Sequence, residues 1–180
     1  MHLNLSEKIF SFFHRFIEKK YHLKRLSKIL AGYTSFKNLI IFDVGANEGE
    51  TIDFFLSLFK NPTIYSFEPE MKSYKKLLKK YEKNKKINLF NLAFGNKKEK
   101  LKLKTNIKSS TSTLSKINTK SKYYNFKSFI LSPGTNNIFL SEENVQVEKV
   151  DNFFKQNEIS TIHILKIDTE GFELNVIKGD

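Results

Sequence analysis

The stretch Leu39-Ile-Ile-Phe-Asp43-Val-Gly45-Ala-Asn47-Glu-Gly49 joins a short hydrophobic run directly to a loop with two glycines. The run is apolar and partly β-branched, which predicts a strand buried on both faces of a parallel sheet. Thr51 to Phe59 follows with the pattern of a helix. Glycines between a strand and a helix let backbone N–H groups approach a ligand closely. This stretch therefore predicts the ligand-binding turn of an α/β domain.

The segments that follow repeat the same alternation of strand and helix. Thr63–Phe67 is predicted as a second strand, ended by Glu68-Pro69, and a Lys-rich helix is expected from about Glu70 to Lys83. Ile87–Ala93 is predicted as a third strand. This order and spacing predict a Rossmann-like, doubly wound, mostly parallel sheet in a domain that spans residues 38–180.

The second half of the domain has a weaker pattern. Residues 96–144 are interpreted as an insertion that carries a hairpin over the sheet edge. Val145–Val150 is predicted as a short strand, and Asp151–Gln156 as a short helix with Asp151 as its N-cap. Ile162–Asp168 returns to the pattern of a buried strand, and Phe172–Ile177 is expected to begin a further helix.

Residues 1–37 are predicted to form an amphipathic helical extension. Asn4 and Glu7 fit an N-terminal capping box, and Gly32 interrupts the helical pattern. We expect this extension to pack on the domain as a lid; the alternative is a basic amphipathic surface for a membrane or a partner protein. The apolar positions recur three to four residues apart: Phe12, Phe13, Phe16, Ile17, Leu23, Leu26, Ile29 and Leu30.

Composition excludes several classes of protein. The chain has no cysteine, which rules out disulfides, thiolate metal sites and a cysteine nucleophile. It has no apolar run of the roughly 18 residues that a membrane span needs and no signal-peptide pattern, so a cytoplasmic location is expected. The net charge of +12 comes mostly from Lys. Nucleic-acid binding is the less favoured explanation of this positive charge, since the sequence has no aromatic-and-basic RNA motif and no zinc module.

The loop after the first strand discriminates between cofactor classes. A phosphate-binding P-loop needs Lys and then Ser or Thr after its last glycine, but Glu50-Thr51 follow Gly49. A dinucleotide fingerprint needs three glycines, and the carboxylates of Asp43 and Glu48 would repel phosphate. A cofactor with a positively charged sulfonium fits better, because Asp43 can attract its cationic end. The candidate cofactor-binding residues of this loop are Asp43, Gly45, Ala46, Asn47 and Gly49.

Glu68 follows the second strand, 19 residues after Gly49. An acidic residue about 20 residues beyond such a loop is expected to bind a ribose, and a carboxylate can accept from both ribose hydroxyls. The alternative is a carboxylate that caps the helix after Pro69. Asp43, Glu68, Asn91 to Ala93 and Asp168 all fall at the carboxyl ends of separate predicted parallel strands, and these ends form one rim of the sheet.

The cluster Lys166-Ile-Asp168-Thr-Glu170 places charges in and after a buried strand, where unpaired charges are rare. Asp168 is the candidate general base for an acceptor hydroxyl. Glu170 is interpreted as its assistant, as a helix cap or as part of a metal site. Two carboxylates without a nearby His are weak support for a metal, and no metal is predicted. His163 is interpreted as structural.

Four stretches together resemble the FkbM-type methyltransferase family, over about Asn38 to Gly179. They are Phe42-Asp-Val-Gly-Ala-Asn-Glu-Gly49, Tyr65-Ser-Phe-Glu-Pro69, Asn91-Leu-Ala-Phe-Gly95 and Leu165-Lys-Ile-Asp-Thr-Glu-Gly-Phe-Glu173. The resemblance implies a class I methyltransferase fold and the methyl donor S-adenosylmethionine (AdoMet). It implies that Asp43, Gly45, Asn47 and Gly49 surround the methionine portion and that Glu68 binds the ribose. It further implies that Asn91 and Ala93 lie near the adenine, and Asp168 and Glu170 near the transferred methyl group.

The same resemblance implies O-methylation of a hydroxyl on a small molecule or glycan. The Ser109-Ser-Thr-Ser-Thr113 run resembles a hydroxyl-bearing stretch that borders the pocket in the family. Family members continue past the helix that begins at Phe172, whereas this sequence ends at Asp180, so we expect a sheet that is incomplete on its C-terminal side. The rival hypothesis is therefore a non-catalytic binding domain that lacks a complete acceptor site.

Overall fold

The main sheet contains four parallel strands in the order β3-β2-β1-β7. The computed structural model describes residues 24–106, 112–115, 126, 128 and 139–179. The four strands are β1 (Ile40–Val44), β2 (Thr63–Phe67), β3 (Ile87–Phe90) and β7 (Ile164–Ile167). In this register Asp43 of β1 lies between Ser66 of β2 and Lys166 of β7. The predicted Rossmann-like α/β fold is confirmed.

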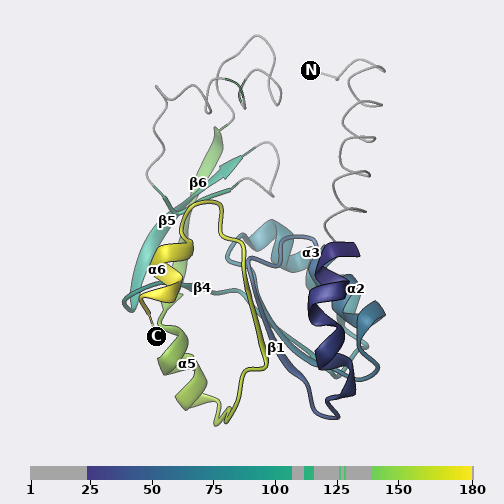
Figure 1. Ribbon diagram of the computed structural model, residues 1–180. Coiled ribbons are helices and arrows are strands. Elements are labelled where there is room, and N and C mark those ends of the chain that lie inside the picture. The colour runs from purple at the N-terminus through teal and green to yellow at the C-terminus, as the bar shows by residue number, and fades with distance from the viewer. Residues whose placement is uncertain (1–23, 107–111, 116–125, 127, 129–138, 180) are drawn as a thin grey trace, which may run out of the picture.

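Helices cover both faces of this sheet (Figure 1). Helices α2 (Glu50–Leu58) and α3 (Met71–Tyr81) pack on one face, where Ile52, Phe55 and Leu77 meet Ile41 and Ile64 of the strands. The other face carries α5 (Val150–Gln156) and α6 (Glu173–Ile177). An aromatic cluster fills that second face: Phe42, Phe67, Phe90, Phe94 and Phe153. Strand β1, with neighbours on both sides, is buried along most of its length. Strand β7 lies at the edge and is only partly buried, so the prediction of a buried strand over Ile162–Asp168 is wrong in its burial.

Helix α3 explains the Lys-rich stretch of the sequence. Ser73, Leu77 and Tyr81 are its buried residues, spaced four apart along one face. The lysines between them are exposed. The predicted amphipathic helix is therefore confirmed, and this block of positive charge is its solvated face.

A second sheet, in the order β4-β6-β5, lies beside the first. Its strands are β4 (Ala93–Phe94), β5 (Glu99–Asn106) and β6 (Phe139–Glu148), and β5 and β6 form the expected antiparallel hairpin. The prediction of one strand over Ile87–Ala93 is wrong. The Asn91 side-chain amide donates to the carbonyl oxygens of Glu68 and Pro69, and Ala93 then pairs with Val147 of the second sheet.

Two predicted element boundaries are also wrong. Strand β6 begins at Phe139 and ends at Glu148, so it is longer than the predicted strand Val145–Val150. Helix α5 begins at Val150 with Lys149 as its N-cap, and Asp151 lies inside the first turn. A carboxylate in the first turn still interacts favourably with the positive end of the helix dipole. Asp151 therefore marks the start of the helix without being its N-cap.

The N-terminal part of the described chain is helical from residue 24 to residue 30, and a 3₁₀ helix, η1 (Ala31–Ser35), follows. Leu30 packs into the core beneath α2, which ties this segment to the domain. The predicted capping box at Asn4 and Glu7 and the apolar positions from Phe12 to Leu23 lie outside the described residues. Within the described part of the chain, no helix is long and apolar enough to cross a membrane.

Candidate functional site

The candidate site lies where the chain reverses its direction across the sheet. From β1 the chain builds β2 and β3 on one side, and β7 then returns to the other side of β1. Ligands of open α/β sheets bind at the carboxyl ends of strands next to such a reversal. A cavity of about 900 Å³, its open side included, lies there. Seven of the predicted site residues line it: Gly45, Ala46, Asn47, Glu68, Ala93, Asp168 and Glu170.

The loop after β1 is held in a tight turn by its own backbone. The N–H groups of Gly45 and Ala46 both donate to the Phe67 carbonyl at the end of β2, over 2.9 and 3.1 Å. Gly45, Asn47 and Gly49 all have positive φ angles, of 80°, 47° and 85°. Gly49 is the N-cap of α2, and its carbonyl oxygen lies 2.8 Å from the Tyr81 hydroxyl. The two glycines are therefore required by the conformation of the turn. This turn brings the start of α2 to the cavity.

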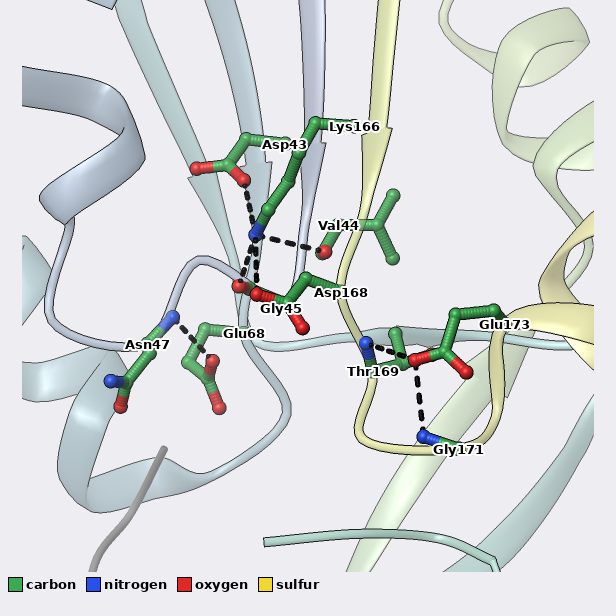
Figure 2. A network of polar contacts seen from close by, with 10 residues as sticks. All are labelled: Asp43, Val44, Gly45, Asn47, Glu68, Lys166, Asp168, Thr169, Gly171 and Glu173. Atoms are coloured by element: carbon green, nitrogen blue, oxygen red, sulfur yellow. Dashed lines mark hydrogen bonds and ion pairs between the residues drawn. The ribbon is translucent and has the colours of Figure 1, made fainter. Parts of the chain in front are cut away.

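Glu68 connects this loop to the end of β2 (Figure 2). Its Oε2 accepts from the Asn47 N–H over 2.7 Å, and its Oε1 accepts from the Glu70 N–H over 2.8 Å. Burial of the Glu68 carboxyl, which is 7% exposed, raises its pKa to about 7 despite these hydrogen bonds. Glu70, and not Glu68, is the N-cap of α3. Glu68 thus accepts a hydrogen bond from the N-cap residue of α3, as the helix-capping alternative expects, and it also lines the cavity.

Asp43 and Lys166 form an ion pair beneath the loop. The Lys166 Nζ lies 3.0 Å from Asp43 Oδ1 and donates to the Gly45 carbonyl over 2.8 Å (Figure 2). Asp43 is completely buried, and its Oδ2 has no hydrogen-bond partner among the described residues. Burial raises the pKa of Asp43, while the charge of Lys166 opposes that rise. The structure thus places an ammonium group where the sequence analysis expected the cationic end of a cofactor.

Asp168 and Glu170 reach the cavity from the turn after β7. Asp168 is anchored through its N–H, which donates to the Val44 carbonyl over 3.0 Å, and its side chain is exposed. Glu170 has a φ of 52°. Glu173 stabilises the turn, because its Oε1 accepts from Thr169 N, Thr169 Oγ1 and Gly171 N. Both candidate catalytic carboxylates therefore lie on one braced turn.

The alternative roles of Glu170 find less support. Phe172 is the N-cap of α6, and no side chain caps that helix. Among the residues that the structure describes, no group of three or more His, Asp or Glu side chains is arranged to hold a metal ion. Glu170 lines the cavity together with Asp168, which is the position that the role of assistant to Asp168 requires.

The second sheet supplies a wall that the sequence analysis largely missed. Leu103, Ser112, Thr113 and Leu114 line the cavity opposite the glycine loop. Thr113 pairs with Lys104 of β5, and its Oγ1 donates to the Glu170 carbonyl over 2.8 Å. The hydroxyl run Ser109 to Thr113 was the only sequence signal for this wall. Ser112 and Thr113 confirm its predicted place beside the pocket, whereas residues 109–111 lie outside the described part of the chain.

Three other predicted residues lie away from the cavity lining. Asn91 holds the backbone of Glu68 and Pro69, as described above, and acts on the site through that turn. Gly49 lies behind the loop against Tyr81, and Asp43 lies beneath it. His163 accepts from the Ile40 N–H through its Nδ1 and packs against Phe36, at the opposite end of the strands. Its geometry fits the predicted structural role.

A parallel α/β sheet with a glycine loop after its first strand and an acidic residue after its second is typical of Rossmann-like folds and is consistent with a methyltransferase of that class. The family model described as the methyltransferase FkbM domain matches residues 43–180, and the chain belongs to this family. This confirms the resemblance drawn from the four sequence stretches. No curated protein and no solved structure matches the chain.

Proposed function

We propose that this chain transfers a methyl group from AdoMet to a hydroxyl oxygen of a small molecule or glycan. The observation that carries the proposal is the hydrogen bond between Glu68 Oε2 and the Asn47 N–H. It joins the glycine loop and the ribose-type carboxylate in one cavity, which Asp168 enters from the other side. Membership of a methyltransferase family supports the type of reaction.

The residues present fit AdoMet in three respects. Each Glu68 oxygen accepts one backbone N–H, which leaves acceptor capacity for two ribose hydroxyls. The glycine loop presents backbone, rather than bulky side chains, to the cavity. Asp43 is paired with Lys166, so the negative charge that favours a cationic ligand comes from the acids that line the cavity, Glu68, Asp168 and Glu170.

When bound, AdoMet supplies an electrophilic methyl group on a sulfonium. The loop after β1 and Glu68 hold the donor, and the turn after β7 presents Asp168 to the acceptor. In methyl transfer, Asp168 would accept the proton that the acceptor hydroxyl loses. Most of the rate enhancement then comes from alignment of the two reactants.

The first experiment is a calorimetric titration with AdoMet, together with the shift of the thermal midpoint that AdoMet causes. Binding is expected for the unmodified chain and should be lost or at least tenfold weaker in E68Q. The control is E82Q, which changes an exposed glutamate at the C-cap of α3 that does not line the cavity. Absence of binding at saturating AdoMet in a folded sample would contradict the proposed function.

The second experiment separates an enzyme from a binding domain. Transfer of label from methyl-labelled AdoMet to a panel of sugars and small alcohols is expected, and D168N should abolish it while AdoMet still binds. Donor binding without transfer to any acceptor in the panel would favour the non-catalytic alternative.

A further inference from the structure

Lys166 is a charged residue on β7, the edge strand of the parallel sheet, directly opposite Asp43 in the register of β1 and β7. Its side chain is 22% exposed and lies against the cavity. The Nζ contacts Gly45 O at 2.8 Å, Asp43 Oδ1 at 3.0 Å, Val44 O at 3.5 Å and Asp168 Oδ2 at 3.9 Å. One ammonium group thus connects the glycine loop, the buried acid and the candidate base.

The surroundings of this ammonium group are acidic. Glu68, Asp168 and Glu170 line the cavity, and Asp43 lies beneath it. Among the described residues that line the cavity, Lys166 is the only one with a cationic side chain. A buried carboxylate without a cation takes up a proton instead of remaining charged. The charge state of this site therefore depends on Lys166.

We propose that Lys166 is a positioning residue for donor binding. Its ammonium group connects the buried Asp43 carboxylate to the carbonyl of Gly45, and its positive charge keeps the surrounding carboxylates negatively charged. This inference rests on the proposed function. Lys166 acts through the loop and the carboxylates, and Glu68 remains the group that contacts the ribose.

Several titratable groups face Asp43 and Glu68. Burial raises the pKa of both carboxyls. Lys166 lowers both, as the largest opposing effect at Asp43 and as a smaller one than the backbone hydrogen bonds at Glu68. Asp168 raises the pKa of Asp43, and Glu70 raises that of Glu68. Tyr81 of α3 interacts with Asp43 as well. Lys166 is the cation in this set, so its removal should raise the pKa of both carboxyls.

The test measures the dissociation constant of AdoMet between about pH 5.5 and pH 8.5. With the Glu68 pKa at about 7, affinity should rise roughly tenfold from pH 6 to pH 8 in the unmodified chain. K166M should move the midpoint of this rise to higher pH, and K166R should restore it. The matched control is K76M, which removes an exposed lysine that pairs with Glu48 of the same loop. K76M should leave the midpoint unchanged.

An unshifted midpoint in K166M would overturn the inference, because a lysine that only fills space has no effect on it. A second readout does not need AdoMet: the pH dependence of thermal stability. A carboxyl that stays protonated in the folded chain but ionises in the unfolded chain makes stability fall as pH rises between its two pKa values. K166M should extend this fall to higher pH, and D43N/K166M should reduce it.

These readouts also separate the two proposals. If the unmodified chain does not bind AdoMet, the proposed function fails, and the stability curves still decide the role of Lys166. Identical pH dependence in K166M and D43N/K166M would contradict the coupling of Lys166 to Asp43. If K166M does not fold, D43N/K166M should fold, because it leaves no unpaired charge. Failure of both variants to fold would assign Lys166 a packing role and overturn the inference.

Discussion

The carbonyl oxygen of Asp168 lies only 2.0 Å from the point that a β-carbon on Gly45 would occupy. The loop after β1 and the turn after β7 are therefore in backbone contact, and no side chain can separate them. Gly45 also has a φ of 80°, a conformation that other residues adopt only with strain. A glycine at position 45 is thus required by the close contact with the turn after β7 as well as by the conformation of its own loop.

Replacement of Gly45 by Ala should reduce the free energy of unfolding by about 2–4 kcal/mol, from backbone strain and from the clash with Asp168. Chemical denaturation measures this loss. Gly32 is the control, since a β-carbon there has no atom within 4 Å. G32A should change stability by less than about 1 kcal/mol. Equal losses in the two variants would contradict the packing seen at Gly45.

Glu68 should make the chain less stable as pH rises between about 4.5 and 7. Its pKa is raised from 4.5 to about 7 in the folded chain, so the folded state holds a proton that the unfolded state has released. Across that window the contribution amounts to at most about 3 kcal/mol. E68Q should therefore lose less stability than the unmodified chain between these pH values, as measured by thermal denaturation at several pH values.

Other carboxyls titrate in the same range, so the comparison between variants is what isolates Glu68. Burial also raises the pKa of Glu143, which acts in the same direction as Glu68. Burial raises the pKa of Glu173 as well, but hydrogen bonds from its own N–H, Gly171 and Thr169 outweigh it and lower that pKa, so Glu173 loses its stabilising effect as pH falls. If E68Q follows the same pH profile as the unmodified chain, the Glu68 prediction is wrong.

Thr113 should stabilise the turn that carries Glu170. Its Oγ1 donates to the Glu170 carbonyl and accepts from the Ser115 N–H over 3.0 Å. T113V keeps the size of the side chain and removes both hydrogen bonds, at an expected cost of about 1–3 kcal/mol. Amide hydrogen exchange at Ser115 should become faster, and T113S should restore it. Unchanged exchange in T113V would show that the hydroxyl does not brace the turn.

The hydroxyl of Tyr81 should contribute to the stability of the fold in addition to its buried ring. The oxygen lies 2.8 Å from Gly49 O and 2.7 Å from Asp53 Oδ1, between the glycine loop and α2. Y81F keeps the buried ring and should cost about 1 kcal/mol in chemical denaturation. Y65F is the comparison, because Tyr65 contacts its neighbours through ring packing. A loss in Y81F no larger than that in Y65F would contradict the role of the hydroxyl.

Much of the main sheet could be predicted because its signals are local. The mostly apolar run Ile40–Val44, the glycine loop that ends at Gly49 and the Lys-rich stretch from Glu70 to Lys83 each act within a few residues of the chain. The site followed from topology: residues after parallel strands meet at one edge of the sheet. For that reason Glu68 and Asp168 could be placed together although 100 residues separate them.

The errors occur where a distant partner decides the structure. The strand predicted over Ile87–Ala93 ends at Phe90, because Ala93 pairs with Val147 of the second sheet. No local sequence pattern predicts this pairing. The wall around Thr113 has the same origin, in its pairing with Lys104. Lys166 stood out as a charge in a buried strand, but its contacts with Asp43 and Gly45 depend on the register between β7 and β1.

The sequence by itself determined the α/β class, the glycine turn and the acids at the strand ends, because side-chain periodicity and backbone preference are properties of neighbouring residues. Only the tertiary structure decided which atoms those acids face. Burial and contact are set by segments far apart in the chain, and they give Glu68 its raised pKa, pair Asp43 with Lys166 and press Asp168 against Gly45. The loop that begins at Asp43 is therefore one half of a site whose other half is supplied by β7.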